Sequence, residues 1–70
     1  MTAEQDFLAV ADALNIDAAH WSENSIQRRF IMEKVVRKVV FDPGLFPIIA
    51  PALEALGPEF HTYRDRAKES

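Results

Sequence analysis

Apolar residues in the first fifteen positions recur at the spacing of one face of an α-helix. The spacing i, i+3, i+4 and i+7 is shown by Phe7, Val10, Ala11 and Leu14. Thr2 followed by Gln5 is the pattern of a capping box, in which each side chain bonds the other residue's backbone N–H. Asn15 is a residue type that favours a helix end. The pattern therefore predicts an amphipathic helix from about Thr2 to Asn15.

Residues 22–41 are predicted to form the longest helix. Ser22 or Asn24 can cap its start, and the sequence Asp-Pro-Gly at 42–44 ends it, because proline restricts the residue before it. On a helical wheel its apolar residues cover well over half of the circumference and fall into two patches. The first patch holds Met32, Val35, Val36 and Val39, and the second holds Ile26, Phe30, Val40 and Phe41.

Residues 45–56 form an apolar segment that two prolines interrupt. Pro47 fits a first helical turn, whereas Pro51 would remove the hydrogen bond to the Pro47 carbonyl. We therefore expect a short turn, a kink and then a helix that begins at about Pro51. Gly57 would end that helix, and Pro58 would begin a last one.

Together these segments predict an all-α fold, because no segment has the pattern of a β-strand. The expected architecture is a small three- to four-helix bundle with a long central helix and a proline-kinked third segment. The chain has 70 residues, enough for one domain, and a single helical domain is expected over 1–70. A domain of this size buries only about 60% of its unfolded surface. Natural domains of this size often gain stability from disulfides, metals or partners. Because the chain has no cysteine, disulfides and thiolate metal sites are excluded.

The two apolar patches of helix 22–41 allow two interpretations. An ordinary surface helix needs one apolar stripe roughly 100° wide. Either the rest of the chain covers both patches, or one patch packs internally and the other contacts a second copy or a larger protein. We favour the second interpretation, because the neighbouring helices are short. The expected interface residues are Ile26, Phe30, Met32, Val36, Arg37, Val40, Phe41, Leu45, Phe46, Ile49 and Leu53.

Charge is unevenly distributed along the chain, whose net charge is −3. Residues 1–26 hold five acids and no base, whereas residues 27–41 hold five bases and one acid, Glu33. This division predicts that an acidic helix lies against a basic one, within the chain or between chains. The bases also raise the alternative of a nucleic-acid-associated regulator. They are Arg28, Arg29, Lys34, Arg37 and Lys38, and their scatter around the wheel disfavours a nucleic-acid partner.

Candidate chemistry is sparse. His61 and Asp65 stand at i, i+4, and Asp17 and His20 stand at i, i+3, spacings that can hold a metal or pair an acid with a base. A metal site needs three or four ligands, so surface pairs are the better interpretation. No serine lies in a G-x-S-x-G motif, and the two isolated glycines cannot form a phosphate loop. We therefore expect no enzyme, no cofactor and no metal.

The expected function is that of a non-catalytic protein–protein interaction module. It would be a small accessory or modulator subunit that self-associates or docks on a larger protein through helix 22–41 and segment 45–56. The opening residues lack the basic segment of a secretory signal, and a cytoplasmic location is expected. No apolar run approaches the length that spans a bilayer.

Overall fold

The computed structural model describes residues 2–69, and this part of the chain folds into four α-helices and two short 3₁₀ helices, with no strand. The α-helices are α1 (Ala3–Ala13), α2 (Ser25–Phe41), α3 (Phe46–Leu56) and α4 (His61–Lys68). The 3₁₀ helices are η1 (Pro43–Leu45) and η2 (Pro58–Phe60). The predicted all-α bundle with a long central helix is confirmed.

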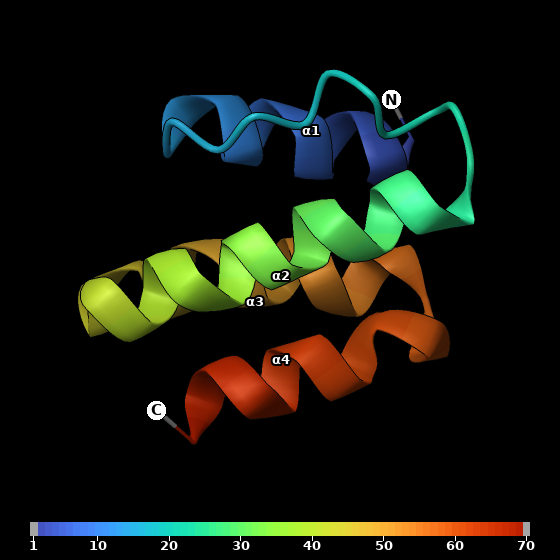
Figure 1. Ribbon diagram of the computed structural model, residues 1–70. Coiled ribbons are helices and arrows are strands. Elements are labelled where there is room, and N and C mark those ends of the chain that lie inside the picture. Colours follow the sequence, from blue (N-terminus) through green and yellow to red (C-terminus); the bar gives the residue numbers. More distant parts are fainter. Residues whose placement is uncertain (1, 70) are drawn as a thin grey trace.

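The other three α-helices surround α2 on all sides but one. In Figure 1, α2 lies at the front with α3 behind it, α1 above it and α4 below it. α1 packs mainly on α3, and α4 packs on both α2 and α3. No helix covers the front of α2 in this view, and this uncovered side is the one that positions the candidate site.

The core joins the buried side of α2 to one large aromatic cluster. The Trp21 ring lies between the rings of Phe7 and Phe60, with centroid distances of 4.8 and 5.6 Å. The largest fully buried side chains are Trp21, Phe7, Met32, Ile49, Leu53, Val35 and Val39. Three residues of the first apolar patch of α2, namely Met32, Val35 and Val39, thus share one core cluster with residues of α1, α3, α4 and the turn before α2.

Local capping explains where the first two helices begin. The Thr2 hydroxyl accepts from the Gln5 N–H at 3.2 Å, and the Gln5 side chain accepts from the Thr2 N–H at 3.1 Å. This is the predicted capping box. Asn24, one of the two predicted candidates, caps α2 by accepting from the Gln27 N–H at 2.9 Å. Asn15 has a φ of 60°, so the chain turns sharply soon after α1 ends.

The predicted helix start at Pro51 is wrong, because α3 runs from Phe46 to Leu56 with Pro51 inside it. The physical reason is the side of the helix on which the prolines lie. Both Pro47 and Pro51 are exposed. The carbonyl that loses its intrahelical donor can therefore bond to water, which reduces the cost of a proline inside a helix.

Leu53→Ala tests the core. Leu53 is 0% exposed, and we expect the substitution to lower the free energy of unfolding by about 2–5 kcal/mol, through lost burial and a cavity. Ile48→Ala on the same helix is the matched control, because Ile48 is 52% exposed and should cost less than about 1 kcal/mol. Urea unfolding followed by circular dichroism measures both. Equal costs would contradict the assignment of Leu53 to the core.

Gly57→Ala tests the connection between α3 and α4. Gly57 has φ 129° and ψ 166°, a backbone conformation that is almost restricted to glycine. A Cβ there would also lie 2.8 Å from a Glu59 carboxylate oxygen. We expect a loss of about 1–3 kcal/mol in the free energy of unfolding. Gly44→Ala, where φ is not positive, should lower the free energy of unfolding clearly less in the same urea experiment. A larger loss for Gly44→Ala than for Gly57→Ala would contradict the role of the Gly57 backbone conformation.

Candidate protein-interaction surface

The uncovered side of α2 carries a line of exposed side chains that we call the α2 stripe. It consists of Ile26, Phe30, Lys34, Arg37 and Phe41, which fall on one side of a helix because their spacing follows its turns. Phe41 is 92% exposed, and Ile26 and Phe30 are 60% and 58% exposed. Large apolar side chains therefore stand at both ends of the stripe, with two cations between them.

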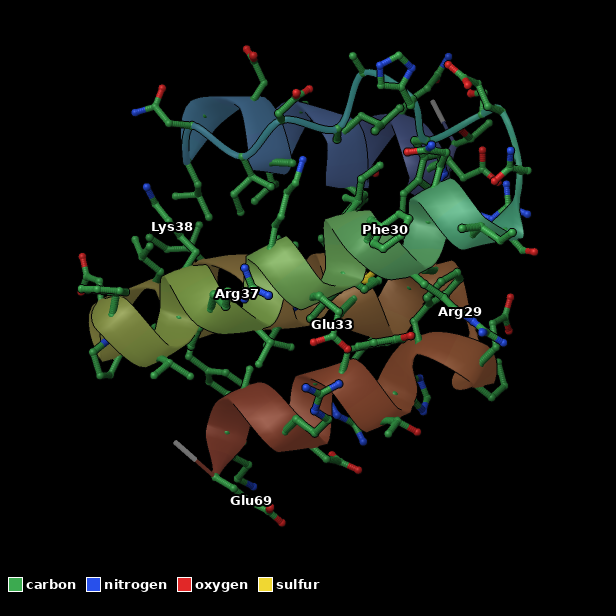
Figure 2. All side chains as sticks on the ribbon, in the orientation of Figure 1. Arg29, Phe30, Glu33, Arg37, Lys38 and Glu69 are labelled. Atoms are coloured by element: carbon green, nitrogen blue, oxygen red, sulfur yellow. The ribbon has the colours of Figure 1, made fainter. Side chains whose placement is uncertain are left out.

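The two edges of the stripe differ in charge. Figure 2 shows Glu33 on the edge of α2 that faces α4, and Lys38 on the edge that faces α1. Glu33 accepts two hydrogen bonds from Arg66 of α4, at 2.7 and 3.0 Å. The Arg66 hydrogen bond lowers the pKa of Glu33, and the same bond raises the pKa of Arg66. The only acid of α2 thus forms an ion pair with α4.

Two hollows flank the cations of the stripe. The larger, of about 660 Å³, lies between residues 15–17 and the second half of α2, and Lys34, Arg37, Lys38 and Phe41 line its α2 side. The smaller, of about 500 Å³, contains Phe30 and also Lys34 and Arg37. The two cations therefore form a ridge between two shallow depressions, and each depression has an aromatic ring in its wall.

The cations of the stripe form no close ion pair in the described residues, although the charge of Arg37 contributes to the lowered pKa of Glu33. Within residues 2–69, neither Lys34 nor Arg37 forms an ion pair, and the same holds for Arg29 and Lys38 beside them. Arg28 differs, because its guanidinium donates to the Trp21 carbonyl at 3.2 Å. The exposed side of α2 is thus both apolar and positively charged.

The expected pairing of an acidic helix with a basic one is not made through ion pairs within the described part of the chain, and the alternative pairing between chains stays a prediction. α1 packs mainly on α3, and no ion pair joins it to α2 in residues 2–69. The acids that do form pairs are Glu23, Glu33, Glu54 and Asp65. Packing of the apolar faces decides which helices meet, so the charge of a whole segment does not predict its neighbour.

The structure divides the predicted interface residues into three groups. Ile26, Phe30, Arg37, Val40 and Phe41 are exposed, and Leu45 and Phe46 are half-buried. The other four are Met32, Val36, Ile49 and Leu53, and they are buried. Met32, Ile49 and Leu53 are corrected to core residues, because they belong to the cluster that contains Phe7 of α1 and Trp21. Val36 is also buried, outside that cluster. Ile48, which is exposed on α3, was not predicted, although its position beside Pro47 and Pro51 was a signal.

The five basic residues proposed for nucleic acid are only partly brought together. Lys34, Arg37 and Lys38 line the larger hollow, whereas Arg28 is held at the Trp21 carbonyl and Arg29 does not line that hollow. On the helical wheel, Arg37 lies at a different angle from both Lys34 and Lys38. Arg37 joins them because long side chains can turn toward a common hollow.

The two acid–base spacings singled out in the sequence form other contacts. His20 Nδ1 pairs with the Glu23 carboxylate, and Asp17 instead accepts from the Ala19 N–H at 3.1 Å. His61 contacts the Glu54 carbonyl at 3.4 Å, and Asp65 pairs with Arg64. In residues 2–69 no three potential ligand side chains gather at one point to hold a metal ion.

Comparison with protein-family models, curated proteins and solved structures found no match for this chain. In the part of the chain that the structure describes, no single helix has the length and apolarity needed to cross a membrane. α2 and residues 43–56 meet that test only when taken together, and they are bent by 118° relative to each other. With no matching protein, the role of the α2 stripe follows from its own residues alone.

His20 provides a pH test of the turn before α2. The hydrogen bond to Glu23, and then the charge of Glu23, raise the pKa of His20 above its ordinary value. Folding is therefore favoured by this pair below the ordinary pKa, and the contribution is lost as pH rises through the folded pKa. We expect Glu23→Gln to move the His20 midpoint downward in an NMR titration. Asp17→Asn should move it less, and an equal or larger shift would contradict the assigned cause.

Proposed function

We propose that this chain is a non-catalytic protein–protein interaction module that docks on a partner through the α2 stripe. One observation carries the proposal. Of the large apolar side chains exposed in residues 2–69, four lie on α2 and one on α3. The four on α2 are Ile26, Phe30, Val40 and Phe41. Isolated exposed apolar residues are ordinary on protein surfaces, but a clustered set on one helix marks an interaction site.

The residue types on the stripe support binding. Aromatic residues, including phenylalanine, and arginine are enriched in the cores of protein interfaces, and the stripe holds Phe30, Phe41 and Arg37. Phenylalanine and isoleucine have no acid–base group, and Arg37 acts as a hydrogen-bond donor. These properties favour recognition over proton transfer, which is the reason for proposing a non-catalytic role.

A second function, association with nucleic acid, is favoured by one observation. Lys34, Arg37 and Lys38 line one hollow next to the exposed ring of Phe41, and cations beside an aromatic ring suit a phosphate backbone and a stacked base. The same hollow, however, is lined by the carboxylates of Asp17 and Asp42. These acids oppose a phosphate, so protein docking remains the first proposal.

Site-specific photo-crosslinking in the native cells tests the docking surface. A photoreactive p-benzoylphenylalanine replaces Phe41 in one variant and Ala9, an exposed residue of α1, in the control. We expect a discrete protein adduct from position 41 and none from position 9. Adding Phe30→Ser should reduce the yield at position 41 by about fivefold or more, the effect of removing one strong anchor.

The control outcomes separate the two functions. Adducts of equal yield from both positions would contradict docking through α2. A nuclease-sensitive adduct from position 41 would instead support association with nucleic acid. Circular dichroism checks that Phe30→Ser still folds, as expected for a side chain that is 58% exposed.

A further inference from the structure

Resting on the proposed function, we infer that the partner presents an acidic amphipathic helix, which lies along the α2 stripe. The first reason is charge. Four cations on or beside the stripe, namely Arg29, Lys34, Arg37 and Lys38, lack an ion pair in residues 2–69. A partner that covers the apolar residues would remove these cations from water, and acidic side chains would then offset the cost.

The second reason is the shape of the stripe. Phe30, Lys34, Arg37 and Phe41 follow the spacing four, three, four, which is the spacing of a coiled-coil seam. Phe30 and Phe41 are eleven residues apart, or about 16 Å along the helix axis. A second helix with the same spacing can place its apolar residues in the hollows beside both rings. An extended strand, with its period of two, would not keep this register.

A second copy of this chain is a poorer occupant. If two α2 stripes packed antiparallel about a twofold axis, Lys34 of one would face Arg37 of the other. If they packed parallel, each cation would face its own copy. In both arrangements Glu33 is already paired with Arg66 of its own chain, so it offsets this repulsion only in part. Like charges placed opposite each other disfavour such pairing, whereas acids on a different helix would be attracted.

Nucleic acid and an anionic membrane also carry negative charge, but they fit the stripe less well. Asp17 and Asp42 line the larger hollow, and Glu33 lines the smaller one. A continuous phosphate surface would approach these carboxylates together with the cations. A helix can instead place single acidic residues beside Lys34 and Arg37, and apolar residues at Phe30 and Phe41.

The test uses the full chain and a designed, fluorescently labelled helical peptide. The peptide carries leucines at the spacing four, three, four and glutamates on both sides of them. A second peptide has lysine in place of every glutamate. Anisotropy titrations at low and at raised salt measure both affinities. We expect the acidic peptide to bind at least about tenfold more tightly, and this difference to shrink as salt screens the charges.

Variants connect the binding to the stripe. Arg37→Glu should weaken the affinity for the acidic peptide by about five- to tenfold, because the attraction between Arg37 and the glutamates becomes a repulsion. Lys68→Glu is the matched control, since it makes the same charge change on exposed α4, and it should have little effect. Phe41→Ser should weaken the affinity for both peptides. Thermal unfolding checks that each variant is folded.

Several results would overturn the inference. Equal affinity for the two peptides, or equal effects of Arg37→Glu and Lys68→Glu, would show that charge on the stripe does not select the partner. Tighter binding to a single-stranded oligonucleotide, or to vesicles rich in phosphatidylserine, would assign the stripe to those ligands. A dimer in light scattering would assign it to a second copy. If no peptide binds but position 41 still crosslinks a protein, the proposed docking function is retained and the inference of an acidic helical partner is wrong.

Discussion

The structure depends on the broad apolar surface of α2, which the other elements within residues 2–69 cover only in part. On one side, Met32, Val35 and Val39 are buried against Phe7, Trp21 and residues of α3. Burial of this kind contributes about 1.5–3 kcal/mol for each large side chain, so that side is the one that fixes the fold. On the other side, the described helices leave Phe30 and Phe41 in water. One side of α2 therefore belongs to the core that stabilises the fold, and the other side forms the candidate site.

The turn between α1 and α2 contributes to the core and also to the wall of the larger hollow beside the candidate site. Trp21 inserts between Phe7 and Phe60, and its carbonyl accepts from the Arg28 guanidinium. The core thus fixes the start of α2 against α1. The sharp turn at Asn15 then brings residues 15–17 to the second half of α2, where they form one wall of the larger hollow. A segment anchored by the core consequently shapes the surface beside the exposed cations.

Features that depend on neighbouring residues were predictable from the sequence, and features that depend on distant residues were not. The capping box at Thr2, the cap at Asn24 and the end of α2 before Pro43 each need only a few adjacent residues. The wheel also separated the two patches of α2, but the identity of the buried one depends on where α1 and α3 pack. The ion pair of Glu33 with Arg66 joins residues 33 positions apart, so no local pattern revealed it. Pro51 was mispredicted because its exposure, set by packing, decides the cost of its lost hydrogen bond.

Charge placement on α2 has a physical consequence for how such a surface remains selective. An uninterrupted apolar stripe from Ile26 to Phe41 would favour contact with any other apolar surface, including a second copy. Lys34 and Arg37 interrupt it between the two rings, and Glu33, which is hydrogen-bonded to Arg66, offsets their charge only in part. Burying these cations without acidic partners costs free energy, so an uncharged apolar surface gains little by covering the stripe. The same charges that weaken general association therefore provide discrimination in favour of an acidic partner.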